Sequence, residues 1–300
     1  MQRTLLLVFN VWLVAATVIA APDPLAATGV PAVSHAGSVV ERRLHDVRQR
    51  LWREVDVPSS AIVVKPGYVI DHAHLLSGFA TTFACAIGYP NAKRCADVDV
   101  GVAWLRSALS CEPRQEAIPC YQVALAKCGD PSCWMSVVAI ARNSESPLCR
   151  EQAVSALGCC RALLAIPDLL RILRHDPYKE RKTGGIWPDM DMYCVRIAAR
   201  FALLGCGVKV TDVKVGEIYE VDETSAVDAL QAGLTSASSA EVAPFLRAIA
   251  AVGGVAAEDA LGRFVRRHEG EAAYSSAIAE ARDLLAAAKR STRGIGVRSQ

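Results

Sequence analysis

The sequence predicts an all-α fold in which helical hairpins stack side by side. The segments SALSC and SALGCC begin 48 residues apart, at Ser107 and Ser155, and AIPC and AIPD, at Ala117 and Ala165, repeat the interval. Small residues close the first helix of four successive units at intervals of 48, 47 and 48 residues: Ser110, Gly158, Gly205 and Gly253. Because a helical hairpin buries its apolar face only against a neighbour, units of this length predict a stack with a shared core.

The chain of 300 residues opens with a segment typical of an export signal. Arg3 precedes the apolar run LLLVFNVWLVAATVIA, which ends in small residues before Pro22. Such a run with a small-residue exit is typical of a signal peptide cleaved near Ala20 or Ala21. The alternative is an uncleaved anchor, because about 18 apolar residues can span a bilayer. We expect residues 1–21 to be a signal peptide and the protein to be secreted or periplasmic, with membrane contact only if the signal is retained.

The rest of the chain divides into four parts. Residues 22–37, rich in Ala, Pro and Gly, predict a flexible leader, and residues 38–97 predict an N-terminal helical cap. Within the cap, the stretch AIVVKPGYVID predicts a small β-hairpin at residues 61–71. The repeats predict a helical domain over residues 98–290, and residues 291–300 form a basic tail that we expect to be disordered.

Glycine and proline predict where the repeat helices end and begin. Glycine takes the left-handed conformation without steric cost, so the closing glycines, such as Gly158, are expected to terminate their helices. Proline is favoured at the first helical position, where its missing amide costs nothing, so Pro119 and Pro167 are expected to begin the following helices. Small residues such as Ala153 and Ala199 would let neighbouring helices approach closely.

Eleven cysteines bear on the compartment and on stability. Cysteines of exported proteins are mostly paired in disulfides. The sequence contains no Cys-x-x-Cys, so the spacing of redox motifs and of zinc knuckles is missing. An odd number leaves one thiol without an intramolecular partner. We expect disulfides to brace the units, and the candidates are Cys85, Cys95, Cys111, Cys120, Cys128, Cys133, Cys149, Cys159, Cys160, Cys194 and Cys206.

The repeat resembles the HEAT family, in particular the short repeats of phycobilin lyases. That pattern is Val-Arg-x-x-Ala-x-x-Ala-Leu-Gly, then Ala-Ile-Pro-x-Leu-x-x-x-Leu and an Asp. The second unit matches it at Arg150, Ala153, Ala156, Leu157, Gly158, Ala165, Ile166, Pro167, Leu169, Leu173 and Asp176. The third unit matches its first half at Val195, Arg196, Ala199, Ala202 and Leu203. The resemblance covers residues 98–268 and implies a HEAT-like α-solenoid that serves as an interaction scaffold.

The chain departs from the family pattern in two places. The turn that is polar in the family reads CCRALL here, beginning at Cys159. In the third unit no Ile-Pro start follows Gly205, and the segment GVKVTDVKVGEIYEVDE, residues 207–223, favours β-structure instead. We regard this segment as a candidate specificity element.

The loop YKERKTGGIWPDMDMY, residues 178–193, is a second candidate, because long insertions in compact domains are often functional. Tyr, Trp and Arg are frequent binding anchors. The predicted binding residues are Tyr178, Lys179, Arg181, Lys182 and Trp187. The alternative is an excursion into solvent without a binding role.

Metal and redox chemistry have few candidates. His72 and His74, and Asp189 and Asp191, could contact a cation, but no third ligand follows at the spacing of a zinc or calcium site. A packed or surface histidine pair is the alternative. The vicinal pair Cys159-Cys160 could form a reactive dithiol, or each cysteine could meet a different partner. We expect no metal and no cofactor.

The formal charge of +2 gives no general field that attracts nucleic acid. Neither Gly-x-Ser-x-Gly nor His-Glu-x-x-His occurs in the sequence. We therefore expect an exported, disulfide-braced scaffold that binds a protein or an extended polymer through its concave face and inserted loops. The alternatives are a loop-decorated enzyme, either a lyase or a hydrolase, and a structural component of the envelope.

Overall fold

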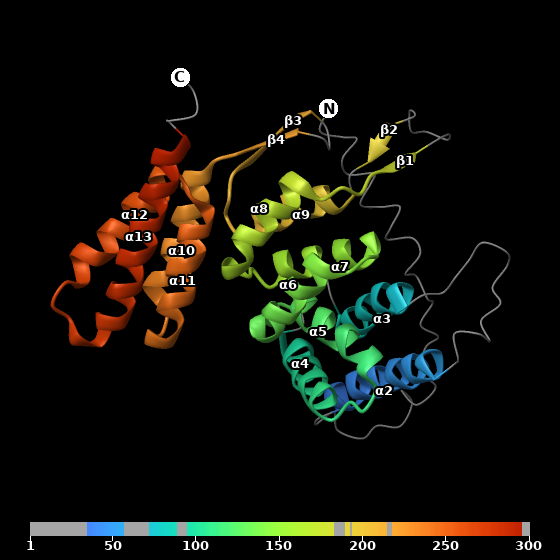
Figure 1. The fold of residues 1–300 in the computed structure, drawn as a ribbon. Coiled ribbons are helices and arrows are strands. Elements are labelled where there is room, and N and C mark those ends of the chain that lie inside the picture. Colours follow the sequence, from blue (N-terminus) through green and yellow to red (C-terminus); the bar gives the residue numbers. More distant parts are fainter. Residues whose placement is uncertain are drawn as a thin grey trace. The chain divides into compact units, whose positions relative to one another are not determined.

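The computed structural model describes residues 35–56, 72–88, 95–182, 190–192, 194–214 and 218–295. This part of the chain is mostly helical, with twelve α-helices that pack in sequential pairs and two small antiparallel hairpins (Figure 1). The prediction of a helical fold built from hairpins is confirmed at this level. The β-hairpin expected at residues 61–71 lies outside the described residues.

The helices of the first two thirds of the chain are α2 (His35–Val55), α3 (His72–Ile87), α4 (Cys95–Ser110), α5 (Ile118–Lys127), α6 (Trp134–Asn143), α7 (Pro147–Cys159), α8 (Ile166–His175) and α9 (Cys194–Gly205). The last four are α10 (Glu223–Ser236), α11 (Ser239–Val252), α12 (Gly254–His268) and α13 (Ser275–Ile295). Short 3-10 turns lead into α5, α6, α8 and α13: η2 (Gln115–Ala117), η3 (Pro131–Cys133), η4 (Leu163–Ala165) and η5 (Ala272–Tyr274). Helices α2 and α13 extend slightly beyond the boundaries expected at residues 38 and 290.

The helices contact one another in two rows. In one row α3 packs on α5, α5 on α7, and α7 on α9. Helices α4, α6 and α8 pack across to this row, and α6 also contacts α8. Helices α10 and α11 form a pair, as do α12 and α13, and α11 contacts α8. Each helix therefore shares its core mainly with helices near it in the sequence.

Two hairpins interrupt the helices. Strand β1 (Glu180–Lys182) pairs with β2 (Met190–Met192), and β3 (Val210–Lys214) pairs with β4 (Ile218–Val221). The second hairpin occupies the segment 207–223, so the predicted β-structure is confirmed there. Its inner face is partly buried, whereas Val213 and Ile218 are more than half exposed, which follows from the alternation of side chains along a strand.

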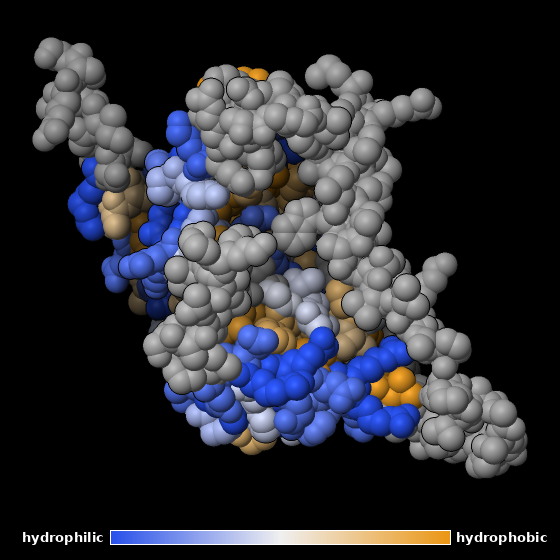
Figure 2. Space-filling model, turned by 90° about the vertical axis from the view of Figure 1, so that its right-hand side faces the viewer, coloured by the Kyte–Doolittle hydropathy of each residue, from blue (hydrophilic) through white to orange (hydrophobic). Residues whose placement is uncertain are grey.

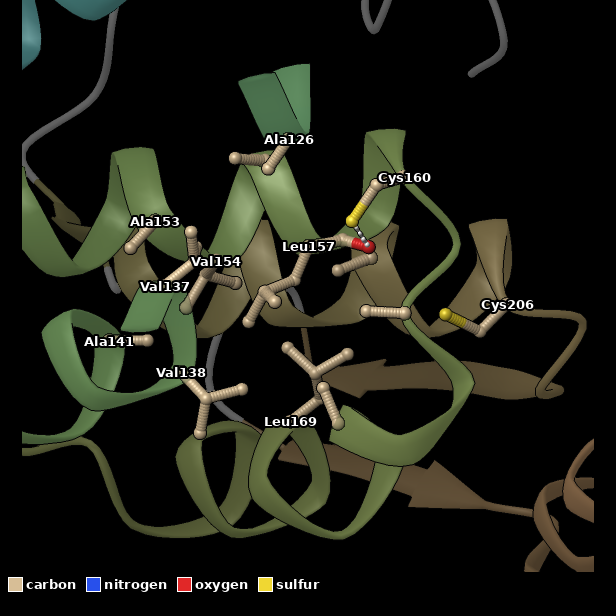
Figure 3. Close-up of a cluster of buried hydrophobic side chains, with 14 of the residues drawn as sticks. Ala126, Val137, Val138, Ala141, Ala153, Val154, Leu157, Cys160, Leu169 and Cys206 are labelled. Atoms are coloured by element: carbon tan, nitrogen blue, oxygen red, sulfur yellow. Dashed lines mark hydrogen bonds between the residues drawn. The ribbon is translucent and has the colours of Figure 1, made fainter. Parts of the chain in front are cut away.

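Small and branched apolar side chains fill the core between the rows. Figure 3 shows Ala126 of α5, Val137 and Val138 of α6, Leu157 of α7 and Leu169 of α8 in one cluster. All five are buried. The prevalence of alanine and valine allows helix backbones to lie close together, as close-packed interiors require.

The helix starts predicted at the prolines are confirmed, whereas the helix ends predicted at the glycines are confirmed only in part. Pro119 and Pro167 lie in the first turns of α5 and α8, as predicted. Gly253 has a positive φ of 80° at the end of α11. The prediction that Gly158 takes a left-handed conformation is wrong, because it lies inside the last turn of α7. The left-handed residue that follows α7 is Arg161, with φ 49°. Gly158 is small for a different reason, which is its contact with α9.

Arginine–aspartate pairs with buried carboxylates join successive elements. Arg150 Nε of α7 donates to Asp176 Oδ2 after α8 at 2.8 Å, and Arg150 Nη2 donates to Asp176 Oδ1 at 3.2 Å. Arg196 Nε of α9 donates to the carbonyl of Asp176 at 2.7 Å, so one residue connects three helices. Arg106 donates similarly to Asp130, at 2.7 Å. These pairs fix the register of neighbouring helices.

A second polar network attaches α2 to the turn after α4. The fully buried carboxylate of Glu112 accepts hydrogen bonds from Trp52 Nε1 at 2.9 and 3.0 Å and from the Tyr121 hydroxyl at 2.9 Å. The guanidinium groups of Arg48 and Arg114 lie over the Trp52 ring at 4.3 and 4.2 Å. The opposite face of α2 is hydrophilic, and the surface at the level of this helix is largely hydrophilic in Figure 2.

The structure forms no disulfide among the ten cysteines whose side chains it describes, so the predicted bracing is not part of this fold. Two of these thiols are hydrogen-bonded to nearby backbone carbonyls. Cys111 Sγ donates to the carbonyl of Ser107 in its own helix, and Cys160 Sγ donates to that of Leu157 (Figure 3). These thiols point back along their own chain segments, while packing and ion pairs connect the units. The side chain of Cys95 lies outside the described residues.

Candidate binding site

The structure places the loop of residues 178–193 partly in the β1–β2 hairpin. Arg181 stands opposite Asp191 in the register of the two strands. Tyr178 is half-buried against the core, and its backbone N–H donates to Asp176 Oδ1 at 3.0 Å, whereas Lys179 is exposed. Trp187 and the side chains of Arg181 and Lys182 lie outside the described residues.

The side chains of the metal candidates lie outside the described part. His72 and His74 belong to the first turn of α3, but their side chains are not described, and neither is Asp189. Asp191 belongs to β2. Among the side chains that are described, no group of three His, Cys, Asp or Glu residues is arranged to hold a metal ion. None of the described helices is both long and apolar enough to cross a bilayer.

A cavity of about 710 Å³ opens between α10, α12 and η5. Its apolar lining is contributed by Leu234, Ala237, Val242, Ala260, Phe264 and Tyr274. Its polar lining is contributed by Gln231, Thr235, Arg263, Arg266, Arg267 and His268. None of these lining residues is an aspartate or a glutamate.

Three aromatic rings pack together at one end of the cavity. The rings of Phe264 and His268 lie 4.8 Å apart, and those of His268 and Tyr274 lie 4.4 Å apart. Phe264 meets Tyr274 edge-on at 6.1 Å. Phe264 and His268 are four residues apart on α12, so the helix presents both rings on one side. This arrangement gives the cavity an aromatic floor.

The arginines of α12 form a cationic rim around that floor. Arg263 NH2 donates to the neutral amide of Gln231 at 3.3 Å, so its charge is not balanced by this contact. In the described part of the chain, Arg266 and Arg267 make no ion pair, and the Arg266 guanidinium lies back over Gly262. His268 Nδ1 contacts Glu271 Oε1 at 3.1 Å. These cations also interact favourably with the C-terminal end of the α12 dipole.

Apart from its arginines, the titratable residues of the cavity lining are His268 and Tyr274. Its lining contains no thiol and no carboxylate that could serve as nucleophile or base. Strongly perturbed thiols lie elsewhere: burial raises the pKa of Cys120 and of Cys128 to about 12, which keeps these thiols protonated. Burial lowers the pKa of the Lys127 ammonium, which donates to Gln152 and Thr81 between α3, α5 and α7.

Sequence reasoning did not identify this cavity. The stretch GRFVRRH, residues 262–268, carries the signal, because it combines an aromatic residue with three arginines. In the sequence it is indistinguishable from a solvated helix face. Only the apposition of α10 and η5 turns it into one wall of a cavity.

Comparison of the chain with family models, with curated proteins and with solved structures finds no match.

Proposed function

We propose that the protein is an exported HEAT-like α-solenoid that acts as a scaffold and binds another protein at the cavity between α10 and α12. The cavity is the observation that carries the proposal, since it joins an apolar aromatic floor to an open polar rim. Binding sites commonly combine an apolar concave surface with a few polar groups that fix orientation. Aromatic and arginine side chains are the usual anchors of protein interfaces.

The order of helix contacts supports the scaffold part of the proposal. Because α3, α5, α7 and α9 each pack on the next, the units stack in the manner that the repeat of about 48 residues suggests. Stacked units leave long surfaces for partners, and the β1–β2 and β3–β4 hairpins extend from the array as further candidate contacts. The export part of the proposal depends on residues 1–21, since the described cysteines form no disulfide that would support it.

An enzyme is the less favoured function. A lyase or hydrolase needs a nucleophile, an acid or a base that faces its substrate. Of such groups the cavity lining provides the imidazole of His268 and the hydroxyls of Thr235 and Tyr274, and it includes neither a thiol nor a carboxylate.

Affinity capture with a blocked cavity tests the proposal. Thr235 lies on the cavity rim and is exposed, so Thr235→Trp should fill the opening without disturbing the core. Thr224→Trp, at an exposed position of the same helix outside the lining, is the matched control. We expect partners from the source envelope or medium to be retained by the wild type and the control and lost with Thr235→Trp. Equal capture by all three proteins would refute binding at the cavity.

A further inference from the structure

We infer that the cavity accepts an acidic protein segment that inserts an apolar side chain onto the aromatic floor and places carboxylates against Arg263 and Arg267. This inference rests on the proposed function, because it assigns the chemistry of the partner to the same cavity.

The charge of the cavity lining favours an acidic partner. Three arginines of α12 line one wall of the cavity, and none of the lining residues is acidic, while Glu271 contacts His268 beside them. On α11 and α13, two exposed arginines are compensated: Arg247 pairs with Glu280 at 3.3 Å, and Arg282 pairs with Glu269 at 2.8 Å. The cavity arginines thus differ from their neighbours in lacking a carboxylate, which is the group that a guanidinium binds best.

The spacing of the arginines favours a partner segment that lies along α12. Arg263 and Arg267 are four residues apart, so they lie on one side of α12, as do Phe264 and His268. The two pairs run alongside each other, one charged and one aromatic. A segment that lies along α12 would therefore meet charge and apolar surface together, rather than in separate places.

The aromatic floor of the cavity favours a protein segment over a simple polyanion. Phe264 is buried, and Leu234 and Tyr274 are partly buried at the cavity. A polymer carrying charge alone would leave the exposed parts of Leu234 and Tyr274 in water. A peptide that alternates acidic and apolar side chains satisfies both parts of the lining.

Fluorescence anisotropy with labelled peptides tests the inference. The probe is an eight-residue peptide with phenylalanine flanked by glutamates, and its matched controls carry glutamine in place of glutamate, or alanine in place of phenylalanine. We expect the glutamate–phenylalanine peptide to bind on the order of tenfold more tightly than either control at low salt, and the difference from the glutamine peptide to shrink with added salt.

Paired variants assign that effect to the cavity. Arg263→Gln combined with Arg267→Gln should weaken the acidic peptide to the level of the glutamine peptide. Arg247→Gln combined with Arg282→Gln removes the same charge outside the cavity and should leave binding unchanged. Equal affinity for the glutamate and glutamine peptides, or tighter binding of an oligonucleotide of equal length, would overturn the inference.

The two experiments fail independently. Loss of captured partners with Thr235→Trp, together with no preference for glutamate, leaves the proposed function standing and removes the acidic segment. Peptide binding that depends on the arginines, together with unchanged capture by Thr235→Trp, supports the acidic site and removes its role in scaffolding.

Discussion

Gly158 of α7 and Ala202 of α9 meet backbone to backbone: a Cβ atom added to Gly158 would lie 2.7 Å from the Cα of Ala202. The substitution Gly158→Ala should therefore force the two helices apart and lower the free energy of unfolding by about 1–3 kcal/mol. Gly78→Ala in α3 is the control, because nothing lies within 4 Å of its added Cβ. This control should raise stability by about 0.5–1 kcal/mol. Urea unfolding of both variants measures the contrast, and a stabilised Gly158→Ala would contradict the contact.

Asp176→Asn should be strongly destabilising. The Asp176 carboxylate is 5% exposed and pairs with Arg150, whose side chain is 12% exposed. Removing one charge leaves a buried guanidinium without its counterion, which typically costs about 3–5 kcal/mol. Glu269→Gln breaks an exposed pair with Arg282 and should cost less than about 1 kcal/mol. Thermal and urea unfolding would show whether the two variants differ in this order.

Trp52→Phe should loosen α2 while leaving the rest of the fold intact. The substitution removes the indole N–H that donates to Glu112 but retains a ring between Arg48 and Arg114. A hydrogen bond to a buried charged group contributes about 1.5–3 kcal/mol. Amide hydrogen exchange should become faster in α2. Trp104→Phe is the control, because Trp104 packs on the Phe83 ring. Amide exchange in α2 should be the same in this variant as in the wild type.

Alkaline solution should destabilise the reduced protein through its buried thiols. Burial raises the pKa of Cys160 to about 12 and of Cys206 to about 11, against an unfolded value near 9. Between these values the unfolded chain loses thiol protons that the folded chain retains, so the free energy of unfolding falls as pH rises above about 9. The stabilisation is complete below that pH.

The thiol contribution is separable from other alkaline effects. Cys206→Ala removes a buried thiol and should flatten the decline of stability with pH, measured by urea unfolding in reductant at pH 8, 9 and 10. Cys111→Ala removes an exposed thiol and should leave the slope as it is. An unchanged slope for Cys206→Ala would show that burial of this thiol does not contribute.

Local features were predictable from the sequence, and features that depend on a neighbouring helix were not. Pro119 and Pro167 begin helices because the constraint lies within their own residues. The β-structure within residues 207–223 was likewise predicted from composition, although its hairpin pairing was not. Gly158 was assigned the wrong role because its small size serves a contact with Ala202, which is remote in the sequence. A repeat period indicates that units recur, but not which atoms of adjacent units touch.

The candidate site shows the same limit more strongly. The binding residues in the loop 178–193 were predicted from composition, and their binding role remains a prediction. The cavity arginines were invisible as a site because Arg263 and Arg267 resemble any solvated helix face until Leu234 and Tyr274 are brought opposite them. The predicted disulfides failed among the described cysteines because pairing depends on the direction of each thiol, which cysteine spacing does not encode.

Because the helix contacts follow the order of the sequence, local unfolding at one end of the array should stay local. Helix α12 contacts α10, α11 and α13 but is remote from α3 and α5. A destabilising substitution in α12 would therefore perturb these neighbours and leave the amides of distant helices protected from hydrogen exchange. Cooperativity in such a chain is short-ranged. Evolution could therefore rebuild the cavity-bearing end for a new partner while the opposite end kept its original sequence.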